Sequence, residues 1–196
     1  NQWGKVWRGD AYIATGLSKL NFVKRVFYCN PEISFGKWWS NFNNFKVKKI
    51  NEKFYVVPIP RLLPFTRKSE FLMSANFLLI GFWLKSLFDI EHPILWFSRP
   101  IYPVEVLIFE KIFKPILTCL RWVDDWESQP TTSDYWKKVL ARNCKFLLKN
   151  VDIVFTVSKD LHSRALRVNQ NSYLMPNGVD YKMFAQTLSH ESNIAD

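Results

Sequence analysis

Short apolar runs alternate with helical stretches along this chain, and this alternation constrains its fold more than any other feature. The runs are rich in β-branched and aromatic residues, which is typical of strands that are buried on both faces. They occupy 25–30, 53–58, 94–98, 118–123, 153–157 and 172–176. Helical spacing of apolar residues fits 10–20, 70–88, 104–116, 134–149 and 159–168. Strand alternating with helix predicts an α/β fold, with a parallel sheet covered by helices on both faces.

Composition limits the class of protein further. With 196 residues the chain is long enough for one sizeable domain and too short for two full-sized ones. Its 17% of aromatic residues excludes the disordered, collagen-like and coiled-coil classes. Three cysteines lie far apart (Cys29, Cys119 and Cys144), and the three histidines have no metal-ligand spacing. We therefore expect no metal site and no disulfide framework, and reduced thiols fit a cytosolic compartment.

Positive charge is concentrated in the first third of the chain. Residues 1–70 hold 13 Lys and Arg against 4 Asp and Glu, whereas residues 71–196 hold 14 against 13. Such asymmetry is typical of a basic face for nucleic acid, a phosphorylated substrate or an anionic membrane, although a solvated basic surface is also compatible with it. The start of the sequence has no signal-peptide pattern, so we do not expect a signal peptide there.

Two segments raise the question of a membrane. Residues 71–88 contain a single charge, Lys85, and come close to transmembrane length. Because Asn76 and Gly81 interrupt the apolar run, we expect a buried core helix there; a spanning helix and a helix with one membrane-facing stripe are the alternatives. The segment 37–55 interleaves lysine with aromatic residues, which is compatible with a membrane-surface patch, with stacking on single-stranded nucleic acid, or with a loop folded onto the core. The proposed membrane-surface residues are Lys37, Trp38, Trp39, Lys46, Lys48 and Lys49.

The strongest local signals come near the end of the sequence. Residues 151–161, VDIVFTVSKDL, predict a buried strand that runs into Ser158, which would cap the next helix. Exposed amides at such a helix start also favour anions. The motif PNGVDYKMF follows at 176–184, and its Asn177-Gly178 pair predicts a turn because both residues tolerate positive φ.

Together these fragments resemble the end of the N-terminal domain in GT-B glycosyltransferases, in the large retaining family that includes glycogen and sucrose synthases. Other segments are similar to the same template, which covers about residues 3–184. They are WRGDAYIATGLSKL at 7–20, FYCNPEI at 27–33, VVPIPRLLPF at 56–65, ILWFSRP at 94–100 and VDDWESQP at 123–130. The last resembles a loop of members that assemble bacterial polysaccharides. The resemblance implies a Rossmann-like domain that forms one half of a GT-B fold.

Two departures from the family pattern affect the expected function. The family's first strand is absent or reduced to residues 1–6, and no counterpart of the C-terminal domain that binds the nucleotide-sugar follows Phe184. We therefore expect residues 1–184 to form the acceptor-side domain and residues 185–196 a linker or disordered tail. Catalysis by this half alone is doubtful, and the catalytic residues stay unassigned. No cofactor is expected, because the nucleotide-sugar is a donor substrate held mainly by a C-terminal domain or a partner subunit.

In a doubly wound sheet, ligands bind beyond the carboxyl ends of the strands. Two arginines would clamp a phosphate or diphosphate there, and carboxylates would accept sugar hydroxyls or deprotonate one. The residues so placed are Arg8, Ser98, Arg99, Asp124, Asp125, Glu127 and Ser158. The interdomain hinge would fall at Asn177, Gly178 and Asp180. Surface salt bridges for Arg99 and helix capping for the paired aspartates are the structural alternatives.

The resemblance implies transfer of a sugar from a nucleotide-sugar to a saccharide or lipid-linked acceptor. It also implies a cytoplasmic location, peripheral on the inner face of the plasma membrane, and makes nucleic acid an improbable partner. The alternative is a non-enzymatic basic α/β module that binds nucleic acid or anionic lipid. The donor sugar, the acceptor and the linkage are not specified by these motifs.

Overall fold

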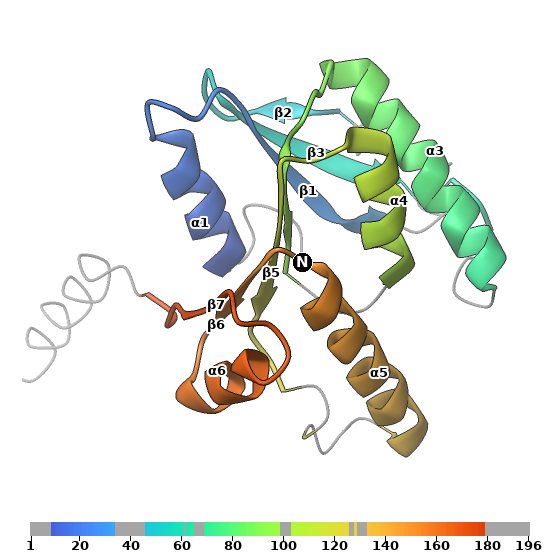
Figure 1. Cartoon of the computed structure of the whole chain (residues 1–196). Helices are drawn as coiled ribbons and strands as arrows, with labels where there is room; N and C mark the ends of the chain where they lie inside the picture. The colour runs from blue at the N-terminus through green and yellow to red at the C-terminus, as the bar shows by residue number, and fades with distance from the viewer. Residues whose placement is uncertain are drawn as a thin grey trace, which may run out of the picture.

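The computed structural model describes residues 9–33, 46–60, 62–64, 69–98, 103–125, 128 and 133–178. Within these residues the strands form two hydrogen-bonded sheets (Figure 1). One sheet has the order β1-β3-β2, made of β1 (Val26–Ile33), β3 (Phe54–Pro60) and β2 (Lys48–Lys49). The other has the order β4-β5-β6-β7, made of β4 (Ile94–Phe97), β5 (Leu117–Trp122), β6 (Ile153–Thr156) and β7 (Ser172–Leu174).

All pairings except one are parallel, as the sequence predicts for strands separated by helices. β1 pairs with β3, and β4, β5, β6 and β7 pair in chain order. The exception is β2, which pairs antiparallel with β3 through Lys48 opposite Val56 and Lys49 opposite Tyr55. The sequence analysis did not predict β2, since two exposed lysines carry no strand pattern of their own. The remaining strands were predicted within a few residues of their observed ends.

Helices cover both faces of these strands. They are α1 (Gly9–Ser18), α3 (Glu70–Phe88), α4 (Pro103–Phe113), α5 (Asp134–Asn150) and α6 (Lys159–Leu166). On one face, Ala14 of α1 packs against Phe54 and Val56 of β3. Their neighbours Val57 and Ile59 point to the opposite face, where α3 and α4 cover them. The predicted α/β class, with helices on both faces, is confirmed.

α4 joins the two main parts of the core. Val106 packs with β5, β6, α5 and α6, in a cluster that includes Leu120, Leu147 and Val154. Ile108, two residues farther along α4, and Ile112, one turn beyond Ile108, pack with α3 and β3. A single helix therefore contributes to both clusters, and it lies between α3 and α5 on the same side of the sheets (Figure 1).

α3 is only half buried, so the expectation of a fully buried core helix is wrong for its outer face. Ile80 and Leu84 are buried against the core, whereas Phe71 is 79% exposed and Phe82 is 61% exposed. By length and composition, α3 is long and apolar enough to cross a membrane. The sequence could not distinguish its two faces because the helix is apolar all round, and periodicity then gives no direction.

Three of the residues that interrupt the apolar sequence of α3 contribute to its packing. Asn76 is fully buried, and its Oδ1 accepts hydrogen bonds from the backbone nitrogens of Leu62 and Leu63 at 2.8 Å and 3.3 Å. Gly81 leaves room for Ile112 of α4, since a Cβ at this position would lie 2.5 Å from the Ile112 Cδ1. Lys85 donates from its Nζ to the Ile112 carbonyl oxygen at 2.8 Å, at the end of α4. These residues fix α3 to its neighbours.

Candidate functional site

The carboxyl ends of β4 to β7 bring most of the described candidate residues to one edge of the sheet. Because the strands run parallel, the residues that follow each strand lie at the same edge. Ser98 follows β4, Asp124 and Asp125 follow β5, Ser158 follows β6, and Asn177 follows β7. The placement of these residues at the strand ends agrees with the sequence analysis.

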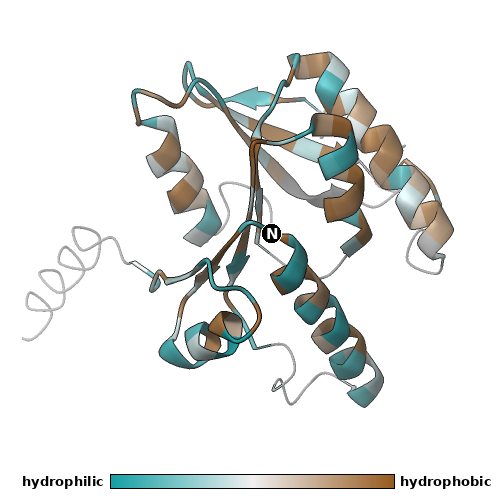
Figure 2. Ribbon diagram, in the orientation of Figure 1, coloured by the Kyte–Doolittle hydropathy of each residue, from teal (hydrophilic) through white to brown (hydrophobic). Residues whose placement is uncertain are grey.

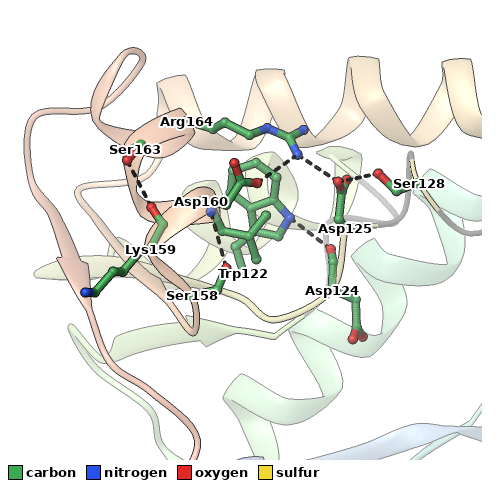
Figure 3. A network of polar contacts seen from close by, with 10 residues as sticks. Trp122, Asp124, Asp125, Ser128, Ser158, Lys159, Asp160, Ser163 and Arg164 are labelled. Carbon is green, nitrogen blue, oxygen red and sulfur yellow. Dashed lines mark hydrogen bonds and ion pairs between the residues drawn. The ribbon is translucent and has the colours of Figure 1, made fainter.

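Asp125 is held in an ion pair with α6. The Arg164 Nη1 donates to the Asp125 Oδ2 at 2.8 Å, and the Ser128 Oγ donates to the same oxygen at 2.6 Å (Figure 3). The guanidinium of Arg164 also lies over the indole of Trp122, 5.0 Å from the ring centroid, and 3.9 Å from an Asp160 oxygen. Asp125 therefore anchors the loop after β5 to α6, which is a positioning role.

Asp124 differs from its neighbour, because its side chain is exposed and points away from this ion pair (Figure 3). Its backbone oxygen accepts a hydrogen bond from the Trp122 Nε1 at 3.0 Å, which fixes the backbone at this position. The carboxylate itself forms no ion pair with any residue that the structure describes. Of the two predicted aspartates, Asp124 is the one with its carboxylate open to a ligand.

Ser158 caps α6, as the sequence predicts. Its Oγ accepts a hydrogen bond from the Leu161 nitrogen at 3.3 Å, and its backbone is extended as N-cap residues require. The cap turns the chain sharply at the end of β6, so α6 begins at the same edge as Asp124 and presents Arg164 to Asp125.

Arg121 is a buried cation that the sequence analysis missed. Its side chain is only 4% exposed, its Nη1 donates to the Asp10 Oδ1 at 2.9 Å, and its Nη2 donates to the Asn177 Oδ1 at 2.6 Å. Gly9 lies against it, since a Cβ there would be 3.0 Å from the Nη2. Arg121 thus connects the start of α1, β5 and the segment after β7. An arginine inside the otherwise apolar strand LTCLRW is the signal that could have revealed it.

The Asn177-Gly178 pair does not form the expected turn. Neither residue has the left-handed backbone conformation that such a turn needs, and Asn177 is instead tied to Arg121 by its side chain. The tertiary contact sets the backbone here, which the local pattern could not show.

Several predicted residues fall outside the described part of the chain. These are Arg8, Lys37, Trp38, Trp39, Arg99, Glu127 and Asp180. Of the proposed membrane-surface set, Lys46, Lys48 and Lys49 are described, and all three side chains are exposed.

The described residues offer no obvious site for metal or thiol chemistry. No group of three or more His, Cys, Asp or Glu side chains with the arrangement of a metal site occurs among them. Two causes raise the pKa of the Cys119 thiol to about 11. The larger is burial of the thiol, and the smaller is the charge of the nearby Asp152 carboxylate. This thiol stays protonated at neutral pH, so it is not an activated nucleophile.

Comparison with solved structures identifies the fold. A sucrose-phosphate synthase from Thermosynechococcus elongatus is similar over 91% of this chain and 88% of that chain, with a TM-score of 0.55 and 12% sequence identity. No protein-family model and no curated protein matches the sequence. The chain has a GT-B-like α/β fold. At this level of identity the likeness concerns the fold alone, and it agrees with the GT-B-like fold expected from the sequence motifs.

Proposed function

We propose that this chain is the acceptor-binding domain of a glycosyltransferase that moves a sugar from a nucleotide-sugar to a saccharide or lipid-linked acceptor. The observation that supports this most is the exposed Asp124 carboxylate at the carboxyl edge of a parallel sheet, in a fold shared with a sucrose-phosphate synthase. In doubly wound sheets this edge is where ligands bind. The proposal extends to a retaining, family-4-like enzyme of bacterial polysaccharide or glycolipid assembly.

In this proposal, Asp124 accepts hydrogen bonds from the acceptor's hydroxyls and helps to deprotonate the one that reacts. Asp125 keeps the loop in position through its contact with Arg164. Arg121 positions the loop that carries the hinge, because its guanidinium holds Asn177 and Asp10 at once. Arg8, Ser98, Arg99, Glu127 and Ser158 complete the proposed acceptor site, with Asn177, Gly178 and Asp180 at the hinge.

The donor requires further groups. Retaining transfer depends mainly on electrostatic stabilisation of the departing diphosphate, and we propose that a second domain or a partner subunit supplies those donors and holds the nucleotide-sugar. The proposed location is the cytoplasm, peripheral on the inner face of the plasma membrane, where a lipid-linked acceptor would be accessible.

The test is glycosyl transfer by the native gene product, isolated from its own cells together with any bound subunit. The preparation is incubated with radiolabelled nucleotide-sugars and a lipid extract of the same cells, and incorporated sugar is counted. Asp124→Asn should reduce transfer about a hundredfold, the usual size of a lost acid–base contribution. Asp134→Asn, which alters an exposed carboxylate at the start of α5, should leave transfer unchanged. Equal activity of the two variants would remove Asp124 from the site, and no transfer from any nucleotide-sugar would contradict the proposed activity.

A further inference from the structure

The outer face of α3 is an apolar stripe without a covering partner among the described residues. The exposed apolar side chains that recur at helical spacing on this face are Phe71, Leu78, Leu79 and Phe82, whereas the exposed Leu87 lies on another side near the end of the helix. The stripe extends from Phe71 to Phe82, which is about 16 Å along the axis of α3. Large apolar side chains exposed in a continuous row mark a surface that binds another apolar phase.

The outer face of α5 carries a row of cations. Lys138, Arg142, Lys145 and Lys149 are all exposed, and their spacing places them on one side of the helix. None of the four forms an ion pair with a described residue. A shallow hollow of about 240 Å³, lined by Tyr135, Lys138, Val139 and Arg142, lies at the start of this row. The row is therefore available to anions.

Both helices belong to the same layer. α3 and α5 lie on the same side of the sheets with α4 between them, and Figure 2 shows the apolar α3 and the more polar α5 in this arrangement. α4 adds to the layer an apolar and a basic side chain one turn apart, the 39% exposed Leu107 and the exposed Lys111. Because each helix buries its inner face against the core, the apolar stripe and the cationic row open on the same side of the domain.

A second basic edge borders the far end of α3. Lys49 of β2 lies 5.9 Å from the centroid of the Tyr55 ring, which in turn contacts Phe88 at the end of α3. Exposed acidic side chains of this layer lie at its helix ends, where Asp89 and Glu91 follow α3 and Asp134 begins α5. Cations therefore lie on one side of the apolar stripe, on α5, and a further cation, Lys49, lies near the C-terminal end of α3.

We propose that the outer faces of α3, α4 and α5 form a docking surface for an anionic lipid bilayer. Phe71, Phe82 and their neighbours enter the headgroup and upper acyl region, while Lys138, Arg142, Lys145 and Lys149 bind lipid phosphates. An anionic bilayer uses both features together, because its phosphates lie directly beside an apolar phase, whereas nucleic acid would use the cations and leave the phenylalanines in water. The proposal rests on the membrane location given under the proposed function and names the surface responsible, but its test is separate from that of glycosyl transfer because it makes no use of the carboxyl edge of the sheet.

Vesicle flotation tests the proposal directly. The full chain is mixed with phosphatidylcholine vesicles prepared with or without phosphatidylglycerol, and the fraction of protein that floats is measured. We expect the chain to float with the anionic vesicles and much less with the neutral ones. Lys138→Gln with Arg142→Gln should weaken binding roughly fivefold for each charge removed. Phe71→Gln with Phe82→Gln should weaken it about tenfold or more, because apolar area no longer leaves water.

Matched controls come from the connection between α1 and β1, which is not part of this layer. Phe22 is 82% exposed there, and Lys19 and Lys24 are exposed beside it. Phe22→Gln, and Lys19→Gln with Lys24→Gln, should bind vesicles as the unaltered chain does. Circular dichroism of every variant establishes that it is folded before binding is compared.

Three results would overturn the proposal. One is flotation that the α3 and α5 substitutions leave unchanged. A second is self-association that Phe71→Gln with Phe82→Gln abolishes while no flotation occurs, which would assign the face to a second copy of the chain. The third is binding of an oligonucleotide, without flotation, that depends on Lys138 and Arg142 and ignores both phenylalanines.

Discussion

Arg121 is the residue at which three distant parts of the chain meet. Its guanidinium is almost fully buried and bonds both the Asp10 carboxylate and the Asn177 side chain. A buried cation that loses its carboxylate stays desolvated without compensation, which costs far more than a broken surface ion pair. The position of the segment after β7 therefore depends on a charge near the end of β5.

Asp10→Asn should lower the free energy of unfolding by about 3 kcal/mol, because Arg121 then keeps its burial and loses its counter-charge. Urea unfolding followed by circular dichroism measures the change. Asp134→Asn is the control. The Asp134 side chain is 94% exposed, and its ion pair with the Lys137 Nζ is long at 3.8 Å. We therefore expect this substitution to change the free energy of unfolding by no more than about 0.5 kcal/mol. Similar stabilities for the two variants would mean that the Arg121 contact is not important for the fold.

Some residues of the site could be predicted because their roles depend on near neighbours in the sequence, whereas residues whose partners are remote could not. The sequence placed Asp124 and Asp125 at the end of a strand and Ser158 at a helix cap, since each role depends on near neighbours. It missed Arg164 as the partner of Asp125, which lies 39 residues away. The contact between Arg121 and Asp10 was missed for the same reason. A contact between residues far apart in the sequence leaves no periodic pattern there.

Among the elements, α3 shows how a glycine can determine helix packing. Gly81 faces α4, where Ile112 occupies the space that a side chain would need. Lys85 then reaches the end of α4 and donates to its carbonyl oxygen. The two helices approach closely at this point because one of them has no Cβ there.

Gly81→Val should destabilise the domain by about 2 kcal/mol, since the added branches force α3 and α4 apart in a well-packed core. Gly16→Ala is the comparison within α1, where nothing lies within 4 Å of an added Cβ, and it should stabilise the protein by about 0.5–1 kcal/mol. Thermal unfolding of both variants measures the difference. A stabilising Gly81→Val would show that α3 and α4 do not pack as described.

Most elements were predictable because their patterns are local. The helices at 134–149 and 159–168 agree with α5 and α6 to within two residues, and the 70–88 prediction agrees with α3. β2 was missed, because a two-residue strand exists only through its pairing with β3. The exposed side of α3 was missed as well, since an apolar helix carries no information about which face the core covers.

At the scale of the whole molecule, the alternation of strands and helices was enough to predict the fold class. The likeness to a sucrose-phosphate synthase agrees with it at only 12% identity, so the two chains share a fold although few of their residues are the same. The separation of the described strands into two hydrogen-bonded sheets could not be read from the sequence. Strand order across a sheet depends on contacts between remote segments.

The proposed function requires that an acceptor saccharide bind at the carboxyl edge of β4 to β7. The most direct measurement is a titration of the ¹⁵N-labelled chain with a short-chain polyprenyl diphosphate sugar, followed by backbone amide shifts. We expect saturable shifts at Ser98, Asp124, Ser158 and Gly178, with affinity reduced about tenfold by Asp124→Asn. Saturation without shifts at this edge, or shifts confined to α3 and α5, would contradict the proposed function.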